Sequence, residues 1–266
     1  MEFMMNFDNK KIGVETLQTI IKQISEKYLT RKASLQIEEK GVSNFVTEAD
    51  KAIEKGIKEE LSRLYPQIQF LGEESEEQNV DFSGAVWILD PIDGTANFIH
   101  DLRHSCLSLA LAINKEVVFG IIYHYYTGEC FYAQKGMGAY LNGSPIHVSS
   151  VKELKYSLAS FGTSPYYKEE AEGICDNLKK VYLLCEDIRR FGSAALELSY
   201  VACGRIDLYL EKGLKPWDYA AAIILIQEAG GTITDYQGHP IDISKPCDIL
   251  AGNGVVEKKL LKEITL

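Results

Sequence analysis

The sequence lacks the features that mark several large classes of protein. Its 266 residues include six cysteines but no C-x-x-C pair or zinc-finger spacing, so we expect reduced thiols in the core. Basic residues are outnumbered 28 to 38, and the net charge of −10 argues against direct binding of nucleic acid. No apolar run approaches a membrane span and no basic-then-apolar leader opens the chain, so we expect a cytoplasmic protein without a membrane partner.

What is present is ordinary globular composition, 46% hydrophobic and 25% charged, with enough length for a sizeable core. Patterning differs between the two halves of the chain. We expect an N-terminal α+β lobe over residues 1–150 and a smaller C-terminal α/β lobe over residues 151–266, with the boundary near residues 149–155.

The first half predicts two helices followed by antiparallel strands. Apolar residues from Leu17 to Tyr28 recur at helical spacing, and a second apolar stripe runs from Ile53 to Leu64. Thr47 with Asp50 three residues later is typical of a capping box at the start of the second helix. Three β-rich runs separated by short turns predict an antiparallel meander, at residues 106–113, 117–123 and 129–133.

The second half alternates between helical and extended patterns, which is typical of an α/β layer. The polar stretch 164–182 predicts an exposed helix. After it we expect helices at 193–203 and 217–229, strands at 206–210, 232–235 and 248–251, and a short helix from residue 255.

The segment WILDPIDGTANF, residues 87–98, carries the strongest functional pattern. An apolar strand ends in Asp90 and Asp93, and Gly94 and Thr95 then open a helix whose free N–H groups can face an anion. Carboxylates suit Mg²⁺, so the two features together indicate a metal-assisted phosphate site. Alternatively, Asp93 and Thr95 only cap the helix. The D-x-D-G-T motif of aspartate-nucleophile phosphatases does not fit, because Pro91 occupies the nucleophile position.

Three further segments add acidic residues at strand or helix ends: VTEAD at 46–50, GEES at 72–75 and LKPWDYAA at 214–221. Together with the DPIDGT turn, they resemble the inositol monophosphatase family, whose members are Mg²⁺-dependent, lithium-sensitive phosphomonoesterases. The resemblance extends from about residue 40 to the C-terminus and includes the segments 191–211 and 217–231. It implies an α+β fold, the layered αβαβα sandwich of sugar phosphatases.

The resemblance also implies two to three Mg²⁺ ions per subunit. By its pattern, Glu73, Asp90 and the backbone carbonyl of Ile92 hold the first ion, and Asp90, Asp93 and Asp218 hold the second. Glu73 also contributes to a third, more loosely bound ion. Catalysis is implied to use Thr95 and Asp50 to activate a water, with Glu73 as the remaining catalytic residue. Asp50 then has two competing roles, as helix cap and as partner of Thr95.

The substrate residues follow from the same resemblance. The N–H groups of Gly94 and Thr95 are expected to hold the phosphate. The alcohol half is expected to meet Asp93 and Glu211 together with the backbone of Gly192, Ser193 and Ala194. Lys40 corresponds to a lysine at the entrance, although the stretch between Lys40 and Asp50 is about one residue shorter than in many members.

The expected function is Mg²⁺-dependent hydrolysis of a small cyclitol or sugar phosphate, with myo-inositol monophosphate as the first choice. The alternatives are fructose 1,6-bisphosphate, a nucleotide 3′-phosphate or another sugar phosphate, or a regulatory interaction protein with the same fold. The resemblance further implies a homodimer. Apolar and aromatic residues of the meander either cover a two-fold interface or fill one subunit's core: Phe119, Ile121, Tyr123, Phe131 and Tyr132.

Overall fold

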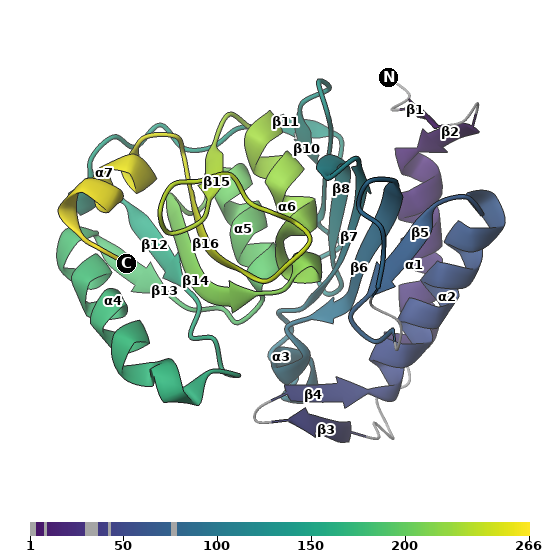
Figure 1. The fold of residues 1–266 in the computed structure, drawn as a ribbon, viewed down its shortest axis with the longest axis horizontal. Coiled ribbons are helices and arrows are strands. Elements are labelled where there is room, and N and C mark those ends of the chain that lie inside the picture. The colour runs from purple at the N-terminus through teal and green to yellow at the C-terminus, as the bar shows by residue number, and fades with distance from the viewer. Residues whose placement is uncertain (1–3, 8–9, 30–36, 42–43, 76–78) are drawn as a thin grey trace.

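The computed structural model describes residues 4–7, 10–29, 37–41, 44–75 and 79–266. The side chain of Lys40 lies outside the described part, so the expectation for this lysine stays a prediction. Two sheets and three layers of helices alternate across the molecule (Figure 1). This arrangement confirms the expected αβαβα sandwich.

The first sheet has seven strands in the order β11-β10-β9-β8-β7-β6-β5. Neighbours are antiparallel from β6 to β11, which confirms the meander, whereas β5 runs parallel to β6. The strands are β5 (Gln69–Gly72), β6 (Ala85–Asp93), β7 (Cys106–Ile113), β8 (Glu116–His124), β9 (Cys130–Gln134), β10 (Ala139–Leu141) and β11 (Ser144–Ile146).

The second sheet has five strands in the order β13-β12-β14-β16-β15. Its strands β13, β12 and β14 are parallel, and β16 pairs antiparallel with β14 and β15. The strands are β12 (Leu158–Phe161), β13 (Asp187–Arg189), β14 (Leu208–Leu214), β15 (Thr232–Thr234) and β16 (Cys247–Gly252).

The helices form the outer and middle layers. They are α1 (Val14–Leu29), α2 (Glu48–Leu64), α3 (Thr95–Ile99), α4 (Ala171–Leu184), α5 (Ala194–Ala202), α6 (Pro216–Glu228) and α7 (Val256–Glu263). Among the described residues there are also two short hairpins and two 3₁₀ turns: β1 (Met4–Phe7) with β2 (Lys10–Gly13), β3 (Ile37–Gly41) with β4 (Asn44–Thr47), η2 (Leu154–Tyr156) and η3 (Lys168–Glu170).

Strand β6 is buried on both faces, because side chains of the two neighbouring cores cover it from either side. Trp87 and Leu89 face α1 and α2, whereas Val86 and Ile88 belong to the core formed with α5 and α6. The alternation follows from the period of two in a strand. The chemistry-bearing residues after Leu89 are therefore held by a rigid, fully packed strand.

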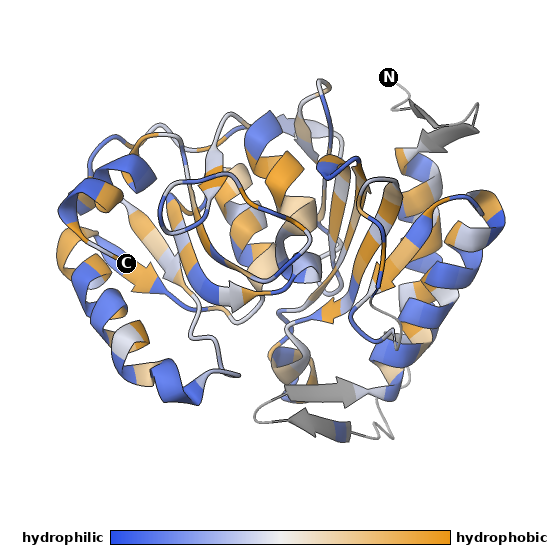
Figure 2. Ribbon diagram, in the orientation of Figure 1, coloured by the Kyte–Doolittle hydropathy of each residue, from blue (hydrophilic) through white to orange (hydrophobic). Residues whose placement is uncertain are grey.

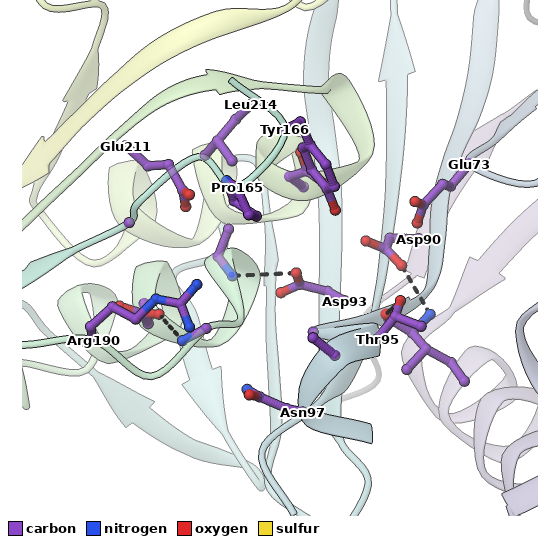
Figure 3. A pocket seen from close by; sticks show the side chains of 18 residues that line it. Glu73, Asp90, Asp93, Thr95, Asn97, Pro165, Tyr166, Arg190, Glu211 and Leu214 are labelled. Atoms are coloured by element: carbon purple, nitrogen blue, oxygen red, sulfur yellow. Dashed lines mark hydrogen bonds between the residues drawn. The ribbon is translucent and has the colours of Figure 1, made fainter. Parts of the chain in front are cut away.

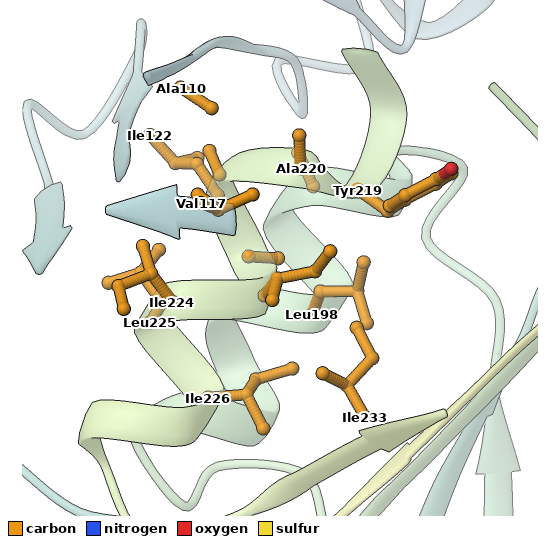
Figure 4. Packing of buried hydrophobic residues seen from close by; sticks show 14 of the residues in the cluster. Ala110, Val117, Ile122, Leu198, Tyr219, Ala220, Ile224, Leu225, Ile226 and Ile233 are labelled. Atoms are coloured by element: carbon orange, nitrogen blue, oxygen red, sulfur yellow. The ribbon is translucent and has the colours of Figure 1, made fainter. Parts of the chain in front are cut away.

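Helix α6 lies between the two sheets, and Figure 2 shows it as mostly apolar, in contrast to the polar outer faces of α2 and α4. Its residues Ala220, Ile224 and Leu225 pack among side chains of both lobes (Figure 4). A helix that is apolar all round is expected where both sides are covered. This burial fixes the position of the α6 N-terminus, from which Asp218 projects.

Several expected elements differ from the observed ones. The polar stretch 164–182 is not one helix: its first residues form a loop, a 3₁₀ turn follows at η3, and α4 begins at Ala171. Pro165 disfavours helical backbone at Ser164, which has a φ of +44°, so the stretch is not helical from its first residue. The strand expected at 206–210 is shifted and extends over β14.

The meander residues named for a dimer lie mostly inside one chain. Phe119, Ile121, Phe131 and Tyr132 are buried, and only Tyr123 is partly exposed. Of the two alternatives for these residues, the structure therefore supports the core of a single subunit for the four that are buried. The homodimer itself stays a prediction.

All six cysteines are free thiols. Cys106 and Cys130 are buried as expected, whereas Cys175 on α4 is exposed, which corrects the expectation of core thiols at that position. Within the described part of the chain, none of the helices combines the length and the apolar character needed to cross a membrane.

Candidate active site

A pocket of about 110 Å³ lies where the carboxyl end of β6 meets the N-termini of α5 and α6. In Figure 3, Glu73 and Asp90 lie on one side of it, Arg190 and Glu211 on the other, and Asp93 between them. The pocket is lined by Glu73, Asp90, Ile92, Asp93, Gly94, Thr95, Ala96, Asn97, Gly162, Pro165, Tyr166, Arg190, Gly192, Ala194, Glu197, Glu211, Leu214 and Asp218.

Three carboxylates from two distant segments converge in this pocket. Asp90 and Asp93 come from β6 and Asp218 from α6, and one ligand oxygen of each lies within 4.8 Å of the others. Burial raises the pKa of Asp90 and of Asp218 well above the usual range, and repulsion from Glu73 and Asp93 adds to the rise. The negative charges of such a cluster repel one another, and a bound cation would offset this repulsion.

Glu73 follows β5 directly and extends the acidic cluster. It lies outside the group of three oxygens, yet its charge has the largest Coulombic effect on the pKa of both Asp90 and Asp218. The parallel pairing of β5 with β6 places the two strand ends side by side. The structure thus brings together the four carboxylates that the sequence indicated.

Asp218 also fixes the start of α6. It is the third residue of the helix, and its carboxylate accepts the backbone N–H of Lys215 at 2.7 Å. The hydroxyl of Ser108 on β7 donates to the carbonyl of Trp217 at 3.0 Å and ties this turn to the first sheet. The first turn of α6, which carries the carboxylate, is therefore tied to the first sheet.

Thr95 lies between Asp50 and the backbone of Ile92. Its hydroxyl is 3.0 Å from the carbonyl of Ile92 and 3.4 Å from Asp50 Oδ1, so the single hydroxyl proton has two acceptors. The other oxygen of Asp50 accepts the backbone N–H of Thr47 at 2.8 Å. The two roles foreseen for Asp50 are thus compatible, because each uses a different oxygen.

Burial sets the protonation of Asp50. The side chain is fully buried, which raises its pKa to about 6, while the hydrogen bonds from Thr47 lower it. Above that pH the group is a carboxylate and can accept the proton of Thr95. A hydroxyl group that orients a reacting water needs an ionised acceptor of this kind for its own proton.

Gly94 has left-handed backbone, with φ of +86°, and precedes the short helix α3. A Cβ at this position would lie 3.0 Å from the carbonyl oxygen of Gly192 and 3.1 Å from that of His104. Only glycine fits both the conformation and the close approach. Gly94 consequently allows the DPIDGT turn to lie directly against the backbone around Gly192.

Asp93 has a second structural role that the sequence did not reveal. Its carboxylate accepts the hydroxyl of Ser193 at 2.6 Å and the N–H groups of Ala195 at 2.7 Å and Ala194 at 3.3 Å. It thus caps helix α5 from outside the helix. The partners lie about 100 residues apart along the chain, so no local pattern could indicate the contact.

The segment 192–194 is held by a carboxylate that the sequence analysis missed. Glu197 of α5 accepts the N–H groups of Gly192 at 2.7 Å and of Ser193 at 3.3 Å, and Ser160 donates its hydroxyl to the same side chain. Burial raises the pKa of Glu197 to about 7. In the sequence, the only local indication of this contact was the four-residue separation of Ser193 and Glu197.

Glu211 lines the far end of the pocket and is nearly fully buried. Its carboxylate accepts the hydroxyl of Tyr209 at 2.6 Å and the N–H of Ser164 at 3.0 Å. A Cβ at Gly162 would overlap this carboxylate at 1.9 Å, so the glycine makes room for it. The expected contact of Glu211 with substrate stays a prediction.

The pocket also contains side chains to which the sequence analysis assigned no role. Asn97 donates to the carbonyls of His104 at 2.8 Å and Phe191 at 2.7 Å and so joins α3 to the 191–194 turn. Tyr166 and Arg190 line the pocket from loops (Figure 3). Tyr166 and Arg190 lie in loops, which have no sequence periodicity, so no pattern indicated them.

Comparison with known proteins agrees with this geometry. The sequence model of the inositol monophosphatase family matches residues 9–265. An inositol monophosphatase of Dictyostelium discoideum is 41% identical over 256 residues, which cover 94% of this chain and 92% of the relative. The Nus factor SuhB of Escherichia coli K12 is 38% identical and covers 90% of this chain and 88% of the relative.

A solved structure adds a fold comparison. The crystal structure of inositol monophosphate bound SaIMPase-II has a TM-score of 0.82 and 27% identity, covering 94% of this chain and 92% of that chain. A cluster of carboxylates that could hold a metal ion, at a pocket within a five-layer sandwich, is typical of metal-dependent phosphatases. The chain belongs to the inositol monophosphatase family, as its sequence motifs predicted.

The pocket fits a hard divalent cation. Its acidic donors are all carboxylates, and none of the described residues that line it is a histidine or a cysteine. Mg²⁺ and similar ions prefer such oxygen ligands. A cation among these side chains would offset the repulsion that raises the pKa of Asp90 and Asp218.

Proposed function

We propose that this protein hydrolyses myo-inositol monophosphate to inositol and phosphate with Mg²⁺ as cofactor. The observation that carries the proposal is the convergence of Asp90, Asp93 and Asp218 within 4.8 Å beside Thr95. The likeness to SaIMPase-II, whose crystal structure has inositol monophosphate bound, supports the substrate. Glu73, Asp90, Asp93, Asp218 and the Ile92 carbonyl would hold the metal.

Mg²⁺ bound there would supply the positive charge that a phosphate dianion and its leaving oxygen need. The chain's own groups orient the water. With its proton directed to Asp50, the Thr95 hydroxyl offers a lone pair to a proton of a water on the pocket side. Asp50 is held in place by Thr47, so the acceptor does not have to reorganise.

The polar groups at the other end of the pocket suit the alcohol half of the substrate. Each carboxylate oxygen of Glu211 makes one hydrogen bond within the protein and retains a lone pair for a hydroxyl donor. The backbone of Gly94 and Thr95 is proposed to face the phosphate. A cyclitol with several hydroxyl groups matches this distribution.

A substrate panel tests the proposal. With Mg²⁺ present, we expect phosphate release with the highest kcat/KM for myo-inositol 1-phosphate among cyclitol, sugar and nucleotide phosphates. Asp218→Asn is the control for the metal site and should lower kcat roughly 100-fold, the usual scale for a lost electrostatic group. Release without divalent cation, or equal activity of Asp218→Asn, contradicts the proposal.

The position of Arg190 supports a second candidate substrate, a sugar bisphosphate such as fructose 1,6-bisphosphate. Among the described lining residues it is the only basic side chain, and its guanidinium donates to Thr163 at 3.2 Å. Figure 3 shows it across the pocket from Glu73 and Asp90. A second phosphate on the alcohol half could pair with it.

Neighbouring arginines give a matched test of this candidate. Arg189 pairs with Asp187 and does not line the pocket, so Arg189→Gln removes the same charge elsewhere. If the bisphosphate is a substrate, Arg190→Gln should raise its KM about tenfold or more, and Arg189→Gln should not. Equal effects of the two variants would leave Arg190 without a role in recognition.

A regulatory role is the alternative from another class, and the name Nus factor SuhB of one relative supports it. A complementation assay in a deletion strain of the source organism distinguishes the two functions. If the role is regulatory, an Asp90→Asn protein that lacks phosphatase activity should still restore growth of a deletion strain. Loss of growth together with loss of activity supports catalysis.

A further inference from the structure

Helix α2 carries two buried carboxylates one helical turn apart. Asp50 is fully buried and Glu54 is 5% exposed. Residues four apart share one face of a helix. Asp50 faces Thr95, as described above, whereas Glu54 faces the loop that follows β5. Glu54 does not line the pocket, so its contacts need another explanation.

Both oxygens of Glu54 are used by the loop that carries Glu73. Oε2 accepts the backbone N–H of Glu74 at 2.8 Å, and Oε1 accepts the hydroxyl of Ser75 at 2.7 Å. The two donors are consecutive residues directly after Glu73. A carboxylate that accepts two hydrogen bonds from one short loop restrains its backbone more than a single contact would.

The fit at Gly72 shows how closely this carboxylate approaches the strand end. A Cβ at Gly72 would lie 2.3 Å from Glu54 Oε2 and 2.6 Å from Oε1. The glycine therefore allows the carboxylate to lie against the backbone at the point where β5 ends. Glu54 is enclosed between α2 and the loop, and its rotamer is fixed by both.

We propose that Glu54 is a positioning residue for cation binding, which holds the 73–75 loop so that Glu73 is directed at Asp90 and Asp218. The proposal rests on the assignment of Glu73 as a metal ligand in the proposed function. Groups behind a metal ligand typically change metal affinity 10- to 100-fold when they are removed. Helix α2 would then align both Thr95 and Glu73, through Asp50 and Glu54.

The test compares three variants on the same helix. Glu54→Ala removes both acceptors, and we expect about tenfold weaker Mg²⁺ binding by calorimetry without substrate. Glu54→Gln can still accept from Glu74 and donate to Ser75, so it should restore affinity to within about twofold of wild type. Glu60→Ala removes an exposed carboxylate that pairs with Arg63 and should bind as wild type does.

Activity gives an independent readout. For Glu54→Ala, the Mg²⁺ concentration for half-maximal phosphate release should rise about tenfold, while kcat at saturating Mg²⁺ stays within about threefold of wild type. A purely structural role would not confine the effect to cation affinity. Unchanged Mg²⁺ affinity in folded Glu54→Ala, or a loss of kcat that Mg²⁺ does not restore, overturns the proposal.

Three further outcomes distinguish failure of this proposal from failure of the proposed function. If Glu54→Ala does not fold, Ser75→Ala decides instead, because it removes one donor and should weaken Mg²⁺ binding roughly threefold; unchanged binding overturns the proposal. If the wild type binds Mg²⁺ but hydrolyses no phosphate ester, the proposed function fails while the calorimetric comparison still tests Glu54. Absence of any Mg²⁺ binding by the wild type overturns both.

Discussion

At the scale of single residues, Asp90 and Asp93 show how neighbouring carboxylates differ in what surrounds them. Asp90 accepts the N–H of Ile92 at 2.9 Å and otherwise faces negative charge. Asp93 accepts three hydrogen bonds at the N-terminus of α5. The dipole of that helix favours an anion at this position. The two residues should therefore respond differently to the same substitution.

We predict that Asp93→Asn lowers the free energy of unfolding by about 1–3 kcal/mol, because the new amide hydrogens face N–H or O–H donors. Asp90→Asn should leave stability in chelator unchanged or raised, since it removes a buried repelling charge. Urea unfolding of both variants measures the difference. Both should lose phosphatase activity, so equal loss of stability would contradict the separate role of Asp93.

Glu197 gives a prediction for pH dependence. Burial raises its pKa from 4.5 to about 7, so the folded protein retains a proton that the unfolded chain releases. Its contribution to stability is present below pH 4.5 and is lost as the pH rises to about 7. The stability of wild type relative to Glu197→Gln should therefore fall across this window.

Urea unfolding of the wild type and Glu197→Gln at several pH values between 4.5 and 7 provides the measurement. The difference in unfolding free energy should be constant outside the window. A parallel pH dependence of the two proteins throughout would show that Glu197 does not titrate there.

The residues of the site were predictable where they sit in local patterns. Asp90, Asp93 and Asp218 end a strand or begin a helix, and the structure brings them together as expected. Glu197 and Asn97 were missed because their contacts with Ser160 and Phe191 form only when distant segments approach each other. The double use of Asp93 was missed for the same reason.

At the scale of elements, long and strongly patterned segments were predictable. The meander strands β7, β8 and β9 and the buried helix α6 lie within one or two residues of the expected positions. The short strands β12 and β13 were missed, because three or four residues carry little periodic information. The direction of β5 relative to β6 depends on the path of the segment between the two strands, which the sequence pattern does not indicate.

The contact between β8 and α6 depends on a glycine. A Cβ at Gly120 would lie 2.4 Å from the carbonyl oxygen of Ala221 and 2.8 Å from Ile224 Cγ2. We predict that Gly120→Ala destabilises the protein by about 1–3 kcal/mol through overpacking. Gly173→Ala in α4 is the control, because nothing lies within 4 Å of the added methyl group.

Thermal or urea unfolding of the two alanine variants distinguishes the effects. The α4 control should be neutral or more stable by up to about 1 kcal/mol, because alanine favours a helix over glycine. If Gly120→Ala were equally harmless, α6 would not be pressed against β8 as the structure shows. Because α6 carries Asp218, kcat of Gly120→Ala should also fall.

At the scale of the whole molecule, the two lobes share a core. Val86, Ile88 and Ala110 of the first lobe belong to the same buried cluster as Ile224 and Leu225 of α6. The boundary expected near residues 149–155 describes a change of topology and stays a prediction. Each lobe has a buried cluster on the outer face of its sheet, but the inner faces of the two sheets share one cluster through α5 and α6.

We therefore predict that the chain unfolds as one cooperative unit. Differential scanning calorimetry in chelator should give a single transition with equal calorimetric and van't Hoff enthalpies. A fragment of residues 1–150 should not unfold cooperatively, because removal of α6 exposes the apolar face of its sheet to water. Two resolved transitions, or a fragment with a sharp transition of its own, would instead establish the lobes as independent domains. In the shared-core case, core substitutions in α6 should lower the stability of both lobes together and disrupt the pocket between them.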